Sequence, residues 1–123
     1  MIARRPMLAG VAMAVLAAWG GTALAAKPGL YGLIGKIKCK PGKRRELLAV
    51  LTDDWGEMPG CSIYMIAEDI EDDDAVWVSE VWDSREAHRA SLQLPGVKDA
   101  IARGRPLIAG FEMSVETRPV PVP

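Results

Sequence analysis

The sequence predicts one α+β domain whose elements follow in the order β-α-β-β-α-β, the ferredoxin-like arrangement. Two observations support this prediction. Four segments rich in β-branched and aromatic residues are interleaved with two segments of helical apolar spacing. The connections between them are short, as an antiparallel sheet with both helices on one face requires. The chain has 123 residues, which is enough for one such domain.

Residues 1–25 are expected to be an export signal, because paired arginines precede an apolar run that ends in an Ala-Leu-Ala cleavage pattern. The run is shorter than the roughly 20 residues that a spanning helix needs, so cleavage is favoured over a retained membrane anchor. The arginine pair leaves twin-arginine export and ordinary secretion both open. We therefore expect a periplasmic or secreted protein, with its domain at residues 26–118 and an extended Pro/Val tail at residues 119–123.

The mature chain is mildly acidic. The whole chain has 15 basic and 16 acidic residues, and removal of the two arginines in the signal leaves a net charge of −3. Nucleic-acid binding needs a basic face, so this class of partner is not expected. One histidine and two distant cysteines are too few for a zinc site, so no metal is expected.

The first three predicted elements lie between residues 30 and 69. Residues 30–38 form the first strand candidate, rich in β-branched and aromatic side chains. After a Pro-Gly turn, residues 43–55 are predicted to be helical, with a leucine stripe that ends in Trp55. Residues 61–69 form the second strand candidate, and the acidic link that follows suits a hairpin.

The most informative stretch joins the third strand to the next helix and contains the only histidine. Alternation along the strand places Glu80 and Trp82 on the same face. Asp83 and Glu86 form a capping-box pattern, which predicts a helix start. His88 is expected at the edge of that helix's apolar face. Trp82 and His88 are therefore expected close together, and any chemistry is expected there.

A short second helix and a last strand complete the predicted domain. A Pro-Gly pair ends the preceding helix, and Val97, Ala100 and Ile101 form a new apolar stripe. Residues 107–117 alternate as a strand. The sheet face opposite the helices would carry apolar side chains that a monomer leaves exposed, so a second copy of the chain is expected to cover it.

The two cysteines are not expected to form a disulfide within a subunit, although export favours disulfides. Cys39 would end the first strand and Cys61 would begin the second. In the predicted sheet these strands are parallel with the third strand between them, so the thiols lie at opposite ends. Bridged cysteines need Cα atoms within about 7 Å.

Four stretches carry a resemblance to a known family: YGLIGKIKCKPGKRRELL, MPGCSIYMIAED, DAVWVSEVWDSREAHRASLQLPGVKDAI and RPLIAGF. The most specific part is Glu-Val-Trp at residues 80–82 followed by Ser-Arg-Glu-Ala-His at residues 84–88. In these stretches the chain resembles the antibiotic biosynthesis monooxygenase family, specifically its small quinol-monooxygenase-like members. The resemblance implies a dimeric α/β barrel made of two ferredoxin-like units. It also implies a monooxygenase that uses O2 on quinols or related aromatics without flavin, haem or metal, so no cofactor is expected.

The resemblance and the chemistry together assign candidate roles. Many relatives have a helix histidine at the position of Ser91, one turn beyond His88 on the same face. The resemblance therefore implies that His88 has the role of this histidine. A quinol must lose a proton before O2 attacks, and a histidine with a pKa near 6.5 suits this task. His88 is therefore the candidate base, and Glu80 could orient it or a substrate hydroxyl. Trp82 and Tyr64 are the candidate walls of the substrate pocket.

Three of these residues also have a structural interpretation: His88 as a surface or structural histidine, Trp82 as core or interface packing, and Glu80 as a solvated or salt-bridged group. Two function classes therefore stay open. The first is a cofactor-independent monooxygenase, and the second is a non-catalytic dimeric protein of the same fold that binds a small ligand or has a stress-related role. Haem binding is a third alternative. Haem-degrading relatives have an asparagine on the first strand, and this chain contains no asparagine.

Overall fold

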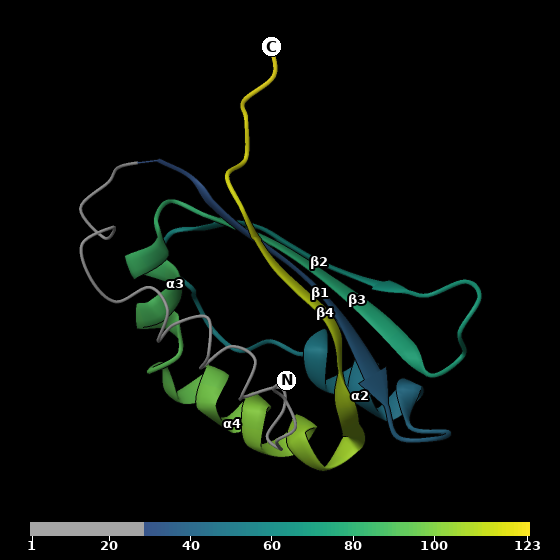
Figure 1. Cartoon of the computed structure of the whole chain (residues 1–123). Coiled ribbons are helices and arrows are strands. Elements are labelled where there is room, and N and C mark those ends of the chain that lie inside the picture. Colours follow the sequence, from purple (N-terminus) through teal and green to yellow (C-terminus); the bar gives the residue numbers. More distant parts are fainter. Residues whose placement is uncertain (1–28) are drawn as a thin grey trace.

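A computed structural model describes residues 29–123, so the predicted export signal lies outside the described residues (Figure 1). The observed order is β-α-β-β-α-α-β, which confirms the ferredoxin-like α+β prediction, with the short helix after the Pro-Gly pair as a separate element. The elements are β1 (Tyr31–Cys39), α2 (Arg44–Leu51), β2 (Cys61–Glu68), β3 (Ala75–Trp82), α3 (Arg85–Ser91), α4 (Pro95–Gly104) and β4 (Ile108–Thr117), with a short 3-10 turn at Arg105–Leu107.

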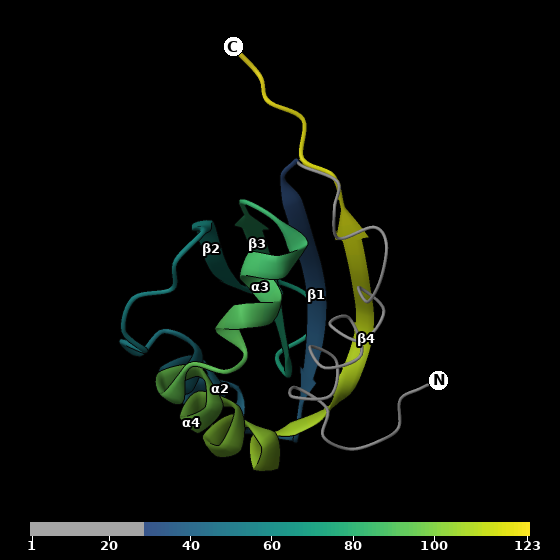
Figure 2. The same cartoon turned by 90° about the vertical axis from the view of Figure 1, so that its left-hand side faces the viewer.

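The four strands form one antiparallel sheet in the order β2-β3-β1-β4. All three described helices lie on one face of this sheet, with α3 over one end and α2 and α4 over the other (Figures 1 and 2). In the register Tyr31 of β1 and Cys61 of β2 are both paired with Trp82 of β3. These three residues therefore mark the end of the sheet that α3 covers. None of the described helices combines the length and the apolar character that a membrane crossing needs.

Helix α2 ends at Leu51, four residues before the predicted end of the helix. The polar run after it forms its own turn, because Asp53 Oδ1 accepts from the Asp54 backbone N–H and Asp54 Oδ1 accepts from that of Gly56. Trp55 still reaches the core, and its indole N–H donates to the Val50 carbonyl at 2.9 Å. The apolar stripe was therefore predicted correctly, but its last member belongs to the loop.

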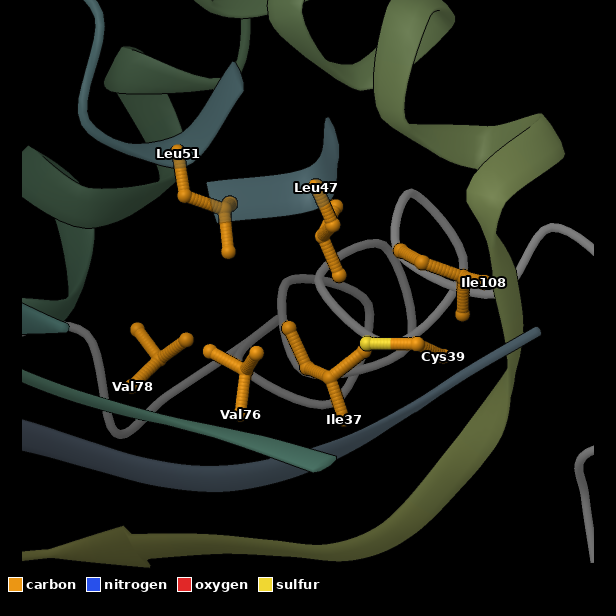
Figure 3. Packing of buried hydrophobic residues seen from close by; sticks show 7 residues of the cluster. All are labelled: Ile37, Cys39, Leu47, Leu51, Val76, Val78 and Ile108. Carbon is orange, nitrogen blue, oxygen red and sulfur yellow. The ribbon is translucent and has the colours of Figure 1, made fainter. Parts of the chain in front are cut away.

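The main hydrophobic core lies between the sheet and helices α2 and α4 (Figure 3). A second, smaller cluster lies at the α3 end and contains Tyr31, Leu33 and Trp82. Both clusters use the face of β3 that the alternation predicts. The main cluster consists of Ile37, Cys39, Leu47, Leu51, Val76, Val78 and Ile108.

The two thiols lie at opposite ends of the sheet. The Cys39 backbone N–H donates to Asp74 at the hairpin end, whereas Cys61 is paired with Trp82 at the α3 end. Both cysteines are free, as the predicted strand order requires.

Arg44, the first residue of α2, clamps the hairpin between β2 and β3. Its Nη1 donates to the backbone carbonyls of Asp69 at 3.0 Å, Asp72 at 3.0 Å and Ala75 at 3.2 Å. The guanidinium thus binds three backbone carbonyls of the hairpin, of which those of Asp72 and Ala75 also accept backbone N–H bonds within it. This contact ties the first helix to a loop about 30 residues further along the chain.

Replacing Arg44 with methionine is expected to destabilise the protein by roughly 2–3 kcal/mol, since hydrogen bonds to a charged donor contribute about 1.5–3 kcal/mol and methionine offers no donor. Urea unfolding followed by circular dichroism measures the change. The neighbouring Arg45 is exposed, so Arg45→Met serves as the control and should stay within about 0.5 kcal/mol of wild type. Equal unfolding midpoints for the two variants would contradict the clamp.

The sheet face opposite the helices is apolar and uncovered by the described part of the chain. Five of its aliphatic and methionine side chains are exposed, with Met65 at 55% and Ile63 at 49%. Adjacent exposed apolar side chains of this size are typical of an interaction surface. We call this surface the bare face; its exposed members are Ile34, Ile63, Met65, Met113 and Val115.

Candidate functional site

Helix α3 begins one residue later than the capping-box pattern predicts. Ser84 has extended backbone angles (φ −161°, ψ 165°), and its side chain accepts from the Ala87 N–H at 3.0 Å, so Ser84 is the N-cap. The prediction that Asp83 starts the helix is therefore wrong. The shift changes which residues face the sheet, so that His88 and Ser91 are buried and Ala90 is exposed.

His88 lies inside the protein and not at the helix edge as predicted. Only 1% of its surface is exposed. Its ring lies between two aromatic rings, 5.7 Å from Tyr31 and 5.4 Å from Trp82 between ring centroids. Both ring nitrogens are buried and have no hydrogen-bond partner among the residues that the structure describes. The imidazole is therefore a polar group enclosed by aromatic walls.

The surroundings of His88 change its basicity. Burial, with a smaller contribution from the positive charge of Arg89, lowers the pKa of His88 to about 4. The expected value near 6.5 does not hold in this environment. At neutral pH the imidazole is uncharged, so one ring nitrogen can donate a hydrogen bond and the other can accept one.

Glu80 contacts Trp82 and not the histidine. The Trp82 indole N–H donates to Glu80 Oε1 at 2.8 Å, and both side chains are buried. Burial raises the pKa of Glu80, and the hydrogen bond from Trp82 opposes this effect in part. Glu80 therefore fixes the indole that forms one wall around His88.

Tyr64 is paired with Glu80 in the register of β2 and β3, but its own side-chain contacts lie in the main core. Its hydroxyl donates to the Leu51 carbonyl at 3.1 Å, and its ring packs edge-on against Trp55 with centroids 5.4 Å apart. Burial raises the pKa of Tyr64, so its phenol stays protonated. It helps to line an apolar cavity between the sheet, α2 and α4, together with residues such as Val78 and Phe111. The structure thus brings His88, Glu80 and Trp82 together and places Tyr64 beside them, in the main core.

Three further residues belong to the site and were missed from the sequence. The Tyr31 hydroxyl donates to Glu116 Oε2 at 2.6 Å. Arg85 lies over the Tyr31 ring at 5.2 Å, and its Nη2 is 3.6 Å from the same carboxylate oxygen. The pairing of β1 with β3 could have indicated Tyr31, because an antiparallel register places it opposite Trp82. Within residues 29–123, no three His, Cys, Asp or Glu side chains are grouped as a metal site requires.

A family model described as "Antibiotic biosynthesis monooxygenase" matches residues 30–103. The chain belongs to this family. The match runs from β1 to α4 and so includes all four predicted site residues, whereas Glu116 lies beyond it on β4. The resemblance that the sequence motifs indicate is confirmed.

Solved structures agree with the family assignment. The chain is similar to a proposed antibiotic biosynthesis monooxygenase from Chloroflexus aurantiacus J-10-fl, with 53% identity, a TM-score of 0.74, and 76% of this chain and 96% of that chain covered. A second protein proposed to be of this kind, from Caulobacter crescentus CB15, is 23% identical with a TM-score of 0.69, covering 76% of this chain and 92% of that chain. A conserved protein from Methanosarcina mazei Go1 shares the fold at 16% identity, with a TM-score of 0.63 and coverage of 72% and 91%. No curated protein matches the chain.

Proposed function

We propose that the protein is a cofactor-independent monooxygenase that oxidises a quinol or a related aromatic substrate with O2. The observation that supports this proposal is the His88 imidazole, buried between Tyr31 and Trp82 with both nitrogens unpaired. A buried polar group without a partner costs about 1–3 kcal/mol. A ligand hydroxyl at His88 would remove that cost, and the flanking rings would stack on an aromatic ligand.

The chemistry needs no reductant other than the substrate. A 1,4-dihydroxybenzene and O2 give a hydroxylated benzoquinone and water, so one oxygen atom enters the ring and the other leaves as water. The substrate supplies all four electrons and both hydroxyl protons. His88 accepts one of these protons in the proposed reaction, and the aromatic walls exclude water from the electron-rich anion.

Oxygen uptake with a panel of substituted 1,4-dihydroxybenzenes tests this proposal, with autoxidation measured in parallel and subtracted. We expect uptake that depends on protein concentration, and one 18O atom in the quinone product when 18O2 is supplied. Uptake equal to autoxidation for every quinol would overturn the proposal. Anaerobic titration of the same quinols separates the alternative, since binding without uptake would support a non-catalytic ligand-binding protein.

We also propose that the bare face pairs with the bare face of a second copy, which would give a homodimer with two-fold symmetry. Size-exclusion chromatography with light scattering on the mature chain is expected to give twice the monomer mass. Met65→Glu places a charge on this face and should yield monomer. The matched control is Ile70→Glu, because Ile70 is 95% exposed on the hairpin loop and off this face. A wild-type monomer at micromolar concentration would contradict the dimer.

A further inference from the structure

A quinol has two hydroxyl protons, and both must leave before the ring becomes a quinone. His88 offers one acceptor at the site. We propose that Tyr31, which is hydrogen-bonded to Glu116, contacts the second substrate hydroxyl. In this proposal Tyr31 accepts the proton of that hydroxyl and gives its own proton to Glu116. This inference rests on the proposed function, and it names a proton path from the buried His88 site to solvent.

The positions of Tyr31, His88 and Glu116 support the path. Tyr31 is 5% exposed, and its ring lies 5.7 Å from the unpaired imidazole of His88, so a ligand that contacts His88 also lies next to Tyr31. The Tyr31 hydroxyl already donates a hydrogen bond to Glu116 Oε2 at 2.6 Å. Its oxygen keeps free lone pairs and can accept a hydrogen bond from a substrate hydroxyl.

The charged groups around Tyr31 fix the position of the proton acceptor. Arg85 of α3 lies over the ring and forms an ion pair with Glu116 of β4, which holds the carboxylate in place. Glu80 of β3 also faces Tyr31, but the Trp82 indole N–H is its hydrogen-bond donor. Burial and the contact with Glu116 raise the pKa of Tyr31, so the phenol is neutral before and after the transfer. Tyr31 therefore passes a proton on and does not hold a charge.

The proton step balances without another reactant. The substrate hydroxyl gives its proton to Tyr31 Oη while the Tyr31 proton moves to Glu116, so the products are a substrate phenolate and a neutral Glu116 carboxyl group. The Glu116 side chain is 21% exposed, so it can release the proton to water. His88 is only 1% exposed, so it cannot release a proton directly to water.

Tyr31→Phe and Glu116→Gln test the path, because each removes one proton-carrying group and keeps the shape of the side chain. Each is expected to lower kcat by about 10²–10⁴-fold, the usual contribution of a positioned proton-transfer group. The double variant should lose no more than either single variant, since two groups in series act as one unit. The loss should shrink at high pH, where the substrate hydroxyl ionises unaided. Asp99→Asn removes a carboxylate that pairs with Arg103 on the surface of α4, and this control should keep wild-type kcat.

The measurement is oxygen uptake across pH with the substituted 1,4-dihydroxybenzene that the wild type oxidises fastest. A wild type that turns over while Tyr31→Phe or Glu116→Gln keeps full kcat would overturn the relay and leave the proposed function intact. A kcat loss independent of pH, or equal losses that add in the double variant, would also overturn it, since a purely structural role predicts those results. No uptake by the wild type would overturn the proposed function and the relay with it.

Discussion

Replacing His88 with leucine is expected to stabilise the protein while removing most of its quinol turnover. Leucine has a similar volume and no polar atoms, so it removes the cost of a buried imidazole without partners, about 1–3 kcal/mol. For a domain of this size each kcal/mol corresponds to a shift in Tm of roughly 4–8 °C. Turnover should fall about 10²–10⁴-fold, because the proposed proton acceptor is lost.

The pH dependence of stability separates this effect from general repacking. The folded pKa of His88 is about 4, below the ordinary value of 6.5. Between these pH values the unfolded chain binds a proton at His88 and the folded protein does not. His88 therefore makes wild-type stability fall as the pH drops from about 6.5 to about 4. The stability advantage of His88→Leu over wild type should accordingly grow as the pH falls from about 6.5 to about 4.

Thermal melts at several pH values and oxygen uptake at neutral pH measure the two parts. His88→Gln is the matched control, since glutamine keeps a buried polar group and should lose turnover without a gain in Tm. A His88→Leu variant that melts below wild type would contradict the cost assigned to the unpaired ring. One that keeps full turnover would remove His88 from the proposed chemistry.

Gly96→Ala is expected to destabilise the protein although alanine is ordinarily the better helix former. A Cβ at Gly96 would lie 2.1 Å from the Trp55 carbonyl oxygen, and a backbone atom of the loop after α2 cannot move away as a flexible side chain can. Overpacking of this kind costs about 1–3 kcal/mol, which exceeds the gain of up to about 1 kcal/mol from helix propensity. The measurement is urea unfolding of the variant and the wild type.

Gly104→Ala in the same helix is the control for this prediction. A Cβ there would meet Leu47 Cδ1 at 3.5 Å and Val50 Cγ1 at 3.8 Å, which are ordinary contacts. We expect unchanged or slightly higher stability for Gly104→Ala, because alanine loses less backbone entropy than glycine. If both variants shift stability in the same direction, the close approach of α4 to the loop at Trp55 does not set the packing of this helix.

The faces of the strands could be predicted from the sequence because alternation is a local property. Glu80 and Trp82 share the buried face of β3 as predicted, and the strand order places Cys39 and Cys61 at opposite ends. The helix phase of α3 could not be predicted in this way. Asp83 and Ser84 are both good N-caps, and a shift of one residue turns a helix by about 100°, since a turn has 3.6 residues. That rotation moves His88 from the helix edge into the core.

The composition of the site depends on pairings that the sequence does not contain. Tyr31 and Glu116 are 85 residues apart, and their contact requires the register between β1 and β4. That register shifts twice, between Lys36 and Ile37 and between Lys38 and Cys39, so counting residues from a predicted strand end would miss it. The hydrogen-bond partner of Glu80 could not be predicted either, because a buried carboxyl group can accept a hydrogen bond from any donor within reach. In the structure this donor is the indole N–H of Trp82.

The positions of the two cysteines make the ends of the sheet separately observable. Cys39 belongs to the main cluster under α2 and α4, and Cys61 packs against the smaller cluster beneath α3. A protein can open locally with a free energy well below that of global unfolding. Because Cys61 is partly exposed and Cys39 is buried, the rate at which a thiol reagent modifies Cys39 would measure how often the main core opens, with Cys61 as the accessible reference. The chain thus contains a natural pair of thiol probes, one against the cluster at the α3 end and one in the main core.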